Sequence, residues 1–296
     1  MKECFRNNLG LNKANQERLE MLKGVIARYR AQGYTLTLRQ LYYQLVTENI
    51  IPNRDSEYAK LSDLLVKARM AGELDWDDIE DRIRVPHIPY SVGGFSEALH
   101  ELVGYYRLNR QTGQENYVEV WAEKDALSQI LKRITDYYHI HLVTNRGYSS
   151  CTAMYDAYKR FYQAKYDGQK GIILYVGDHD PSGVDMVRDI RDRLAEFGVE
   201  PEVISVALTM EQIEEYHLPP NPAKIKDPRS KWYIEKYGNT SWEVDALKPQ
   251  VLDQLVRDAV EERIDIALFD KVVEKEKQDK VKLQKIAQKE KKEKKE

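Results

Sequence analysis

The chain has few cysteines and no long apolar run. Only Cys4 and Cys151 are cysteine among its 296 residues, too few for a disulfide framework or a cysteine-based zinc site. No stretch approaches the ~20 apolar residues that a membrane-spanning helix needs. The first six residues lack the apolar core of a signal peptide, and no phosphate-binding loop of the Walker type is present. These absences predict a cytoplasmic protein with no membrane segment and no ATPase site of its own.

An excess of basic charge is also lacking. The 46 Lys and Arg residues are outnumbered by 49 Asp and Glu residues, which gives a formal net charge of −3. Nucleic-acid-binding domains are often basic overall, so the bulk charge argues weakly against such a partner. It does not exclude one, because binding depends on local clusters of Lys and Arg, and acidic metal ligands lower the total.

Hydrophobic periodicity divides the chain into five parts and predicts an α/β fold. Residues 1–86 read as three helices and a strand-like wing, the pattern of a winged-helix (CAP-like) domain. Residues 87–116 form a connector. Residues 117–207 alternate strands and helices, which indicates a doubly wound domain with a central parallel sheet. Residues 208–270 are a mostly helical extension. Residues 271–296 are a Lys- and Glu-rich tail, either a solvated, fraying helix or disordered chain, or a weak DNA contact.

Three acids stand where the strands of the predicted sheet end. Glu123 follows the expected strand 118–121, and Asp178 and Asp180 follow the apolar strand 171–176. Function in open α/β sheets gathers at the carboxyl ends of strands, and carboxylate oxygens suit Mg²⁺ or Mn²⁺. We therefore expect a metal site at Glu123, Asp178 and Asp180. His179 between the two aspartates is interpreted as a spacer, and residues 242–247, which alternate apolar and acidic side chains, as packing.

The acidic motifs resemble a known family. The segment 123–126 (Glu-Lys-Asp-Ala), followed by Asp-His-Asp-Pro-Ser-Gly at 178–183, is similar to the Toprim fold of the topoisomerase VI A subunit and the related meiotic double-strand-break transesterase. Between them, residues 142–148 resemble the family's strand and Gly-rich turn, although Asn145 and Arg146 depart from its pattern. The resemblance implies that Glu123, Asp178 and Asp180 are the metal ligands.

A tyrosine motif upstream carries the other half of the resemblance. The family has an Arg-x-x-Tyr-Tyr-like motif in its winged-helix domain, matched here by Arg39, Tyr42 and Tyr43. The resemblance implies that Tyr43 is the nucleophile, with Arg39 contacting phosphate or activating the phenol. Helical geometry places Tyr42 with Leu38 and Leu45 on an apolar face and Tyr43 on a more polar one. A DNA-contacting or structural role for Tyr43 stays open.

Basic side chains elsewhere are candidates for DNA contacts. A cation at each position offers a phosphate contact, while a solvated helix face explains the helical ones equally well. The candidate DNA-binding residues are Arg39, Arg54, Lys60, Lys67, Lys124 and Arg146.

The sequence therefore predicts a Mg²⁺-dependent enzyme, with Mn²⁺ as a substitute, that cleaves double-stranded DNA. In the first hypothesis Tyr43 attacks a phosphate to give a 5′-phosphotyrosyl intermediate, assisted by the metal at Glu123. In the second, metal-activated water hydrolyses the same bond. In the third, the chain binds DNA without cutting it. The resemblance also implies a homodimer, in which the tyrosine of one protomer faces the metal site of the other, and a separate ATPase partner chain for any ATP-driven step.

Overall fold

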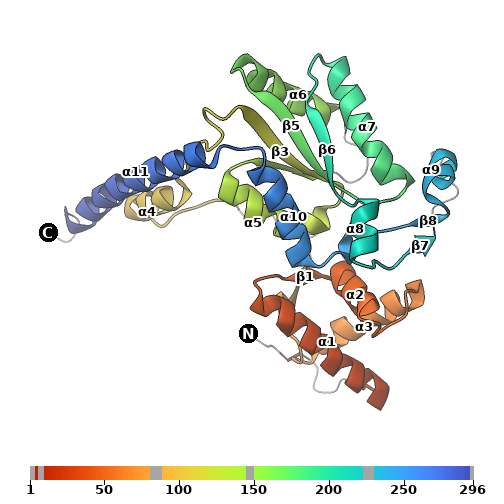
Figure 1. Ribbon diagram of the computed structural model, residues 1–296. Helices are drawn as coiled ribbons and strands as arrows, with labels where there is room; N and C mark the ends of the chain where they lie inside the picture. Colours follow the sequence, from red (N-terminus) through yellow and green to blue (C-terminus); the bar gives the residue numbers. More distant parts are fainter. Residues whose placement is uncertain (1–3, 6–9, 81–88, 145–149, 223–229, 294–296) are drawn as a thin grey trace.

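The computed structural model describes residues 4–5, 10–80, 89–144, 150–222 and 230–293, with side chains to residue 288. It is an α/β structure in which a four-stranded parallel sheet stands beside an N-terminal group of helices (Figure 1). A long C-terminal helix extends away from both (Figure 1).

The N-terminal unit packs three helices around a shared core. Helices α1 (Lys13–Ala31), α2 (Leu38–Thr47) and α3 (Asp55–Met70) bury apolar side chains such as Leu22, Leu41 and Leu61. Thr37 and Gln40 cap α2 reciprocally, which satisfies backbone donors at its start. The strands β1 (Leu36–Thr37) and β2 (Ile79–Glu80) pair in parallel, with the short helix η1 (Trp76–Asp78) before β2.

The central sheet has the order β4-β3-β5-β6, and all of its pairings are parallel. Its strands are β3 (Asn116–Ala122), β4 (His141–Thr144), β5 (Lys170–Val176) and β6 (Glu202–Ala207). Helices α5 (Ser128–Tyr138) and α10 (Pro249–Glu261) cover one face, and α6 (Cys151–Tyr166) and α7 (Pro181–Glu196) cover the other. Two separate hydrophobic clusters correspond to these two faces.

The winding of the chain reverses between β3 and β5. From β3 the chain moves through α5 to β4 on one side, and from β5 it moves through α7 to β6 on the other. Because neighbouring connections leave in opposite directions, a crevice opens at the carboxyl ends of these two strands, where open α/β sheets bind ligands. Glu123 and Asp178 follow those two strand ends.

The remaining elements surround this end of the sheet or lie along the C-terminal helix. Near the sheet these are η2 (Asp125–Leu127), α8 (Met210–Glu215), β7 (Asn221–Pro222), α9 (Ser230–Tyr237), β8 (Thr240–Ser241) and η3 (Val244–Ala246). Helix α4 (Phe95–Tyr105) packs against the 28-residue helix α11 (Ile266–Glu293).

The α/β class and the four strands expected from the sequence are confirmed. The first connection of the sheet consists of η2 and α5, because residues 125–127 turn tightly at the site before the helix begins. Helix α11 runs across the boundary expected between residues 270 and 271, so the charged tail continues a packed helix. No described helix is both long and apolar enough to cross a membrane. The winged-helix and Toprim names stay predictions.

The first half of α11 is anchored by a buried carboxylate. Glu276 accepts hydrogen bonds from the Arg110 guanidinium at 3.1 Å, the Leu108 N–H at 3.1 Å and the Lys280 ammonium at 2.9 Å. Burial alone would raise the pKa of Glu276, but these donors lower it to about 2. Phe269, about two turns earlier, packs against Tyr137 and Tyr138.

We predict that Glu276→Gln destabilises the protein by about 3 kcal/mol, because it leaves the buried Arg110 guanidinium without its counter-charge. The measurement is urea unfolding followed by circular dichroism at neutral pH. Glu274→Gln is the matched control, since the Glu274 side chain is 60% exposed. An equal effect of the two substitutions would contradict the anchoring role of Glu276.

The Glu276 carboxylate makes the free energy of unfolding depend on pH. The pKa of Glu276 is lower in the fold than its ordinary value of 4.5, so its contribution is complete above that value and is lost as the pH falls toward 2. We therefore expect the stability difference between wild type and Glu276→Gln to shrink over that range in the same unfolding measurement. A difference that stays constant from neutral pH to the acid limit would contradict the depressed pKa.

Candidate functional site

Backbone hydrogen bonds at the carboxyl edge of the sheet join the first two acids. The Glu123 N–H donates to the Val176 carbonyl at 2.9 Å, which extends the pairing of β3 with β5. The Glu123 carboxylate in turn accepts from the Asp178 N–H at 2.9 Å. Glu123 therefore lies against the backbone of the Asp178 turn, and the Tyr175 hydroxyl donates to its carboxylate at 3.4 Å.

Asp180 begins helix α7. Its Oδ1 accepts from the backbone N–H groups of Ser182 at 2.9 Å and Gly183 at 2.8 Å, the usual role of an aspartate N-cap. Gly183 is required by space, because a Cβ at this position would lie 2.1 Å from the Asp178 carbonyl oxygen and 3.0 Å from a Glu123 carboxylate oxygen. The Gly in the sequence motif thus permits the close approach of the turn to Glu123.

A two-residue bridge brings a distant segment to this turn. The His179 N–H donates to the Trp242 carbonyl at 2.9 Å, and the Trp242 N–H donates to the His179 carbonyl at 3.0 Å. The Val244 N–H then donates to Asp178 Oδ1 at 3.0 Å. The His179 ring is buried and its Nδ1 lies 2.8 Å from the Tyr233 hydroxyl. Beyond its place as a spacer, His179 therefore holds residues 242–244 beside Asp178.

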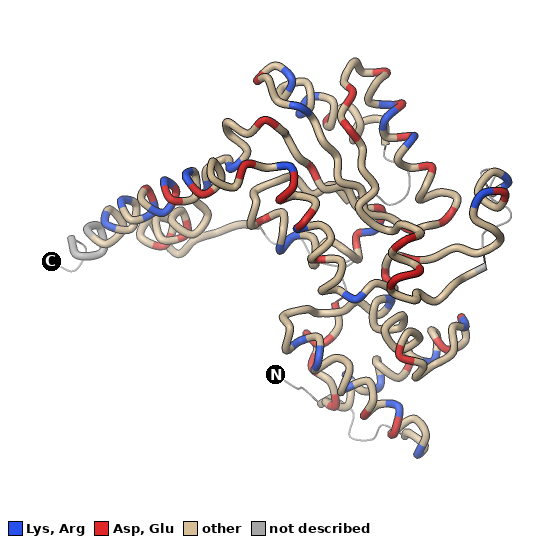
Figure 2. Tube along the Cα trace, viewed as in Figure 1, with Lys and Arg blue, Asp and Glu red and all other residues tan. Residues whose placement is uncertain are grey.

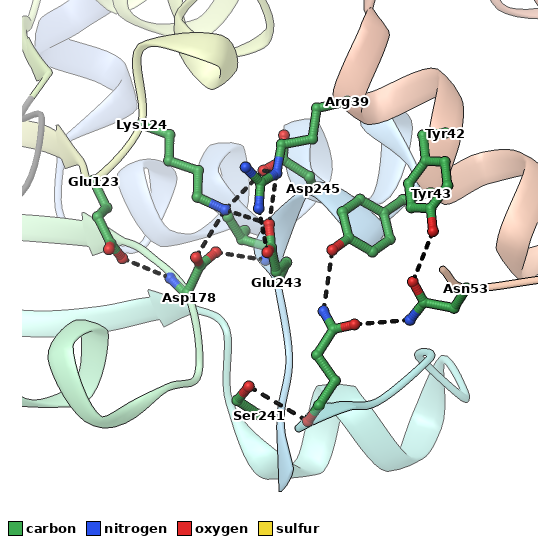
Figure 3. A network of polar contacts seen from close by, with 12 residues as sticks. Arg39, Tyr42, Tyr43, Asn53, Glu123, Lys124, Asp178, Ser241, Glu243 and Asp245 are labelled. Atoms are coloured by element: carbon green, nitrogen blue, oxygen red, sulfur yellow. Dashed lines mark hydrogen bonds and ion pairs between the residues drawn. The ribbon is translucent and has the colours of Figure 1, made fainter. Parts of the chain in front are cut away.

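The bridged segment supplies two further acids. Asp178, Glu243 and Asp245 each offer a carboxylate oxygen within 4.8 Å of the others. The Lys124 ammonium lies among them, 2.7 Å from Asp178, 2.8 Å from Glu243 and 2.9 Å from Asp245 (Figure 3). One cation thus contacts three buried or half-buried carboxylates.

The charges of this cluster depend on one another. Burial raises the pKa of Asp178, and the neighbouring Glu123, Glu243 and Asp245 raise it further, while Lys124 lowers it. Burial alone would lower the pKa of Lys124, but Asp245, Asp178 and Glu243 raise it well above its ordinary value. Because like charges this close repel, the carboxylates need a cation between them.

One carboxylate oxygen of the cluster has no hydrogen-bond partner and is available to a metal ion. Asp245 is 1% exposed, and its Oδ1 is buried without a hydrogen-bond partner, while its Oδ2 contacts Lys124. A buried carboxylate oxygen without a partner is costly unless a ligand or ion satisfies it. Three carboxylates with a free oxygen are the ligands that Mg²⁺ and Mn²⁺ prefer, so Asp178, Glu243 and Asp245 are suited to hold a metal ion.

Helix α2 brings Arg39 and Tyr43 to the same place. Gln44 in α2 donates to the Leu247 carbonyl at 3.3 Å, which docks the helix on η3. Arg39 Nε donates to Glu243 at 2.7 Å and lies 3.9 Å from Asp245. A pocket of about 520 Å³ is lined by residues of α2, the Asp178 turn and the segment before η3: Arg39, Tyr42, Tyr43, Asn53, Asp55, Tyr58, Asp178, Asp180, Asn221, Ser241, Trp242 and Glu243.

Tyr43 is held in a chain of amide and hydroxyl groups. Its oxygen accepts from the Asn221 side chain at 3.0 Å, Asn53 donates to Asn221 at 2.7 Å, and the Tyr42 hydroxyl donates to Asn53 at 2.9 Å (Figure 3). Burial raises the pKa of Tyr43 to about 12, with a further contribution from Glu243, while the Asn221 hydrogen bond and Arg39 oppose the rise. The phenol is therefore neutral at neutral pH. Tyr43 is also buried as completely as Tyr42, because α2 is covered on both sides.

The structure unites some of the predicted site residues and separates others. Tyr43, Arg39, Asp178 and Asp180 share the pocket, whereas the three-acid cluster contains Asp178 without Glu123 or Asp180. A metal role for those two acids stays a prediction. Arg146 lies outside the described residues.

Arg39 lines the pocket, whereas the other candidate DNA-binding residues of the N-terminal helices are not among its lining residues. Arg54 is exposed at the start of α3. Lys60 and Lys67 line a surface groove of about 440 Å³ between α1 and α3 together with Arg18. Two of these cations are already paired, since Arg18 and Lys60 contact Glu57 at 2.8 and 2.7 Å.

Residues 242–247, interpreted as packing, also contribute two acids to the three-acid cluster. Val244, Ala246 and Leu247 are indeed buried in the core, but Glu243 and Asp245 face the site. The alternation of apolar and acidic residues was the available signal, because it sets two acids between apolar side chains that pack in the core. No local pattern in the sequence indicates the bridge from Trp242 to His179.

No protein-family model, no curated protein and no solved structure matches this chain. The assignment of a function therefore rests on the site itself.

We predict that Lys124→Gln binds Mn²⁺ at least about tenfold more tightly than wild type, because a metal ion shared by Asp178, Glu243 and Asp245 takes the place of the Lys124 ammonium. Tenfold corresponds to about 1.4 kcal/mol, a modest fraction of the repulsion between close charges in a site of low dielectric. The measurement is calorimetric titration with MnCl₂. In the absence of metal, the variant should also melt at a lower temperature than wild type, and Mn²⁺ should restore it.

The matched control is Lys132→Gln, which removes the same charge from an exposed position of α5 and should leave Mn²⁺ affinity unchanged. Weaker binding by Lys124→Gln than by wild type would show that Lys124 supports the metal site and does not compete with it.

Proposed function

We propose that this protein is a metal-dependent enzyme that cleaves double-stranded DNA, with Tyr43 as its nucleophile. The observation that carries the proposal is that Tyr43 and Arg39 share one pocket with Asp178 and Glu243. These residues come from three segments far apart in the sequence. Their convergence joins the two motifs, Tyr-Tyr and Asp-x-Asp, on which the resemblance to the topoisomerase VI A subunit rests, and supports interpreting the two parts as winged-helix and Toprim units.

The residues of the pocket have distinct roles in this proposal. Arg39 contacts the phosphate, because a guanidinium matches two phosphate oxygens. Asn221 orients the Tyr43 hydroxyl through its hydrogen bond at 3.0 Å. The carboxylates Asp178, Glu243 and Asp245 would hold Mg²⁺ or Mn²⁺, which would supply charge stabilisation at the phosphoryl group.

The reaction is a transesterification. The Tyr43 oxygen forms a bond to phosphorus as the bond from phosphorus to the 3′-oxygen breaks, which leaves a 5′-phosphotyrosyl end and a free 3′-hydroxyl. The phenol must lose its proton, and with a pKa of about 12 it does not do so unaided at neutral pH. As the oxygen attacks, its proton passes to a water molecule, and the departing 3′-oxygen takes up a proton from water.

Two other functions remain as alternatives, each favoured by one observation. The high pKa of Tyr43 favours hydrolysis by metal-activated water, which needs only the acids. The Lys124 ammonium, which already neutralises the three carboxylates, favours a chain that binds DNA without cutting it. The pocket lies within a single chain, so the contact between Tyr43 and the acids does not itself require the second protomer that the family resemblance implies.

The experiment is to trap the covalent intermediate. Supercoiled plasmid is incubated with protein and Mg²⁺ and denatured, and the products are separated with and without protease treatment. Wild type should give breaks that stay protein-linked until protease is added. Tyr43→Phe should reduce these breaks by at least about a thousandfold, since it removes the attacking oxygen.

Tyr42→Phe is the matched control, because it weakens the hydrogen-bond chain through Asn53 but leaves the attacking Tyr43 oxygen in place, so protein-linked breaks should persist. Asp178→Asn should abolish them. Cutting by Tyr43→Phe together with inactivity of Asp178→Asn would establish hydrolysis by water. Binding of DNA by wild type without any break would leave only the non-cleaving function.

A further inference from the structure

Helices α4 and α11 form an arm that leaves the body of the molecule. The two helices lie side by side, and the second half of α11 extends away from the sheet and the N-terminal helices (Figure 1). At 1.5 Å per residue a helix of 28 residues spans about 42 Å. The arm is fixed at its base, because Glu276 is bound to Arg110 and the Leu108 N–H, and Tyr106 donates to Asp279 at 3.2 Å.

Within the arm, side chains on one face of α11 are buried, whereas no side chain of α4 is buried. Along α11, Phe269 is 3% exposed and Ala287, near its end, is 2% exposed. By contrast, none of the eleven residues of α4 is buried, although Phe95, Leu99 and Leu102 are apolar. The side chains of Phe95 and Leu102 are 58% and 49% exposed. Among the described elements, α4 is thus the helix whose apolar side chains have the least cover.

The exposed Phe95 and Leu102 and the half-buried Leu99 between them lie in register. Positions 95, 99 and 102 are spaced by four and three residues, so they form one stripe along the helix. A helix that keeps such a stripe in water gains little from folding, because its stability comes from burying an amphipathic face. Two packed helices make a single layer, and a layer needs a second one to bury its outer face.

The charges of α4 and α11 indicate which partner supplies the second layer. Helix α4 carries Glu97 and Glu101 and no Lys or Arg, while residues 271–288 of α11 carry six lysines and three acids. The alternating charges of α11 run along the arm in Figure 2. The arm therefore presents an acidic, apolar helix beside a basic one. Such a surface is complementary to itself when a copy is turned by a two-fold rotation, since α4 of each copy meets α11 of the other.

We propose that the arm is a self-association surface, and that two copies of this chain pack their α4 and α11 helices into an antiparallel four-helix bundle. The stripe of Phe95, Leu99 and Leu102 lies at the centre of that bundle. Nucleic acid fits the same surface poorly, because the glutamates of α4 repel phosphate. The proposal does not depend on the function of the pocket, which is formed by other elements.

The test measures the mass of the full-length chain by light scattering during gel filtration, over a range from about 1 to about 100 µM. Wild type should have the mass of two chains at the higher concentrations. The double variant Phe95→Glu with Leu102→Glu should stay monomeric throughout, with dissociation at least about a hundredfold more favourable. The control is Tyr166→Glu, since Tyr166 is 80% exposed on α6 outside the arm, and it should dimerise as wild type does.

A second measurement covers the case in which the double variant unfolds. Leu102→Cys should react with a maleimide more slowly as protein concentration rises, while the exposed Cys4 and Cys151 serve as internal references. A monomeric wild type at 100 µM, or a dimer that survives the double substitution in a folded protein, would overturn the proposal. Plasmid cleavage by the monomeric variant is measured separately. A wrong self-association hypothesis and a wrong cleavage hypothesis therefore give different results.

Discussion

Mutual repulsion among the carboxylates at the end of the sheet is the constraint on which the site depends. The His179–Trp242 bridge brings Glu243 and Asp245 beside Asp178, and the Lys124 ammonium offsets the repulsion by contacting all three carboxylates. Arg39 adds a second cation through Glu243, and so ties helix α2 to the same group of charges. The docking of the N-terminal helices onto the sheet and the placement of Tyr43 therefore follow from the way these acids are neutralised. A metal ion would satisfy the same constraint and would also occupy the free Asp245 oxygen.

This dependence links binding of a cation to the position of the tyrosine. Glu243 contacts Lys124 and Arg39 at once and lies next to the Tyr43 phenol. Replacement of the Lys124 ammonium by a metal ion would thus change the charge near the Tyr43 phenol without any movement of the sheet. The Asn221 side chain, itself bound by Asn53, donates to the phenol oxygen. The pocket is organised before substrate arrives, which is how a site limits the reorganisation needed during reaction.

The sequence predicted the sheet well and the site in part, for physical reasons. Strands such as 171–176 are continuous apolar runs, and their period identifies them locally. Asp178 and Tyr43 belonged to motifs that could be recognised one segment at a time. Glu243 and Asp245 were missed because their role depends on a bridge between Trp242 and His179, which are 63 positions apart. The tail was expected to be solvated, yet Glu276 and Ala287 are buried, since α4 and the Arg110 loop cover a helix whose own pattern is mostly charged.

The most direct test of the metal site is a crystal structure with Mn²⁺, in which anomalous scattering locates the ion. The account predicts a peak within coordination distance of Asp178, Glu243 and Asp245, with the Lys124 ammonium displaced from among them. A peak bound by Glu123 and Asp180 alone, or a Lys124 that keeps its three contacts at saturating Mn²⁺, would contradict it.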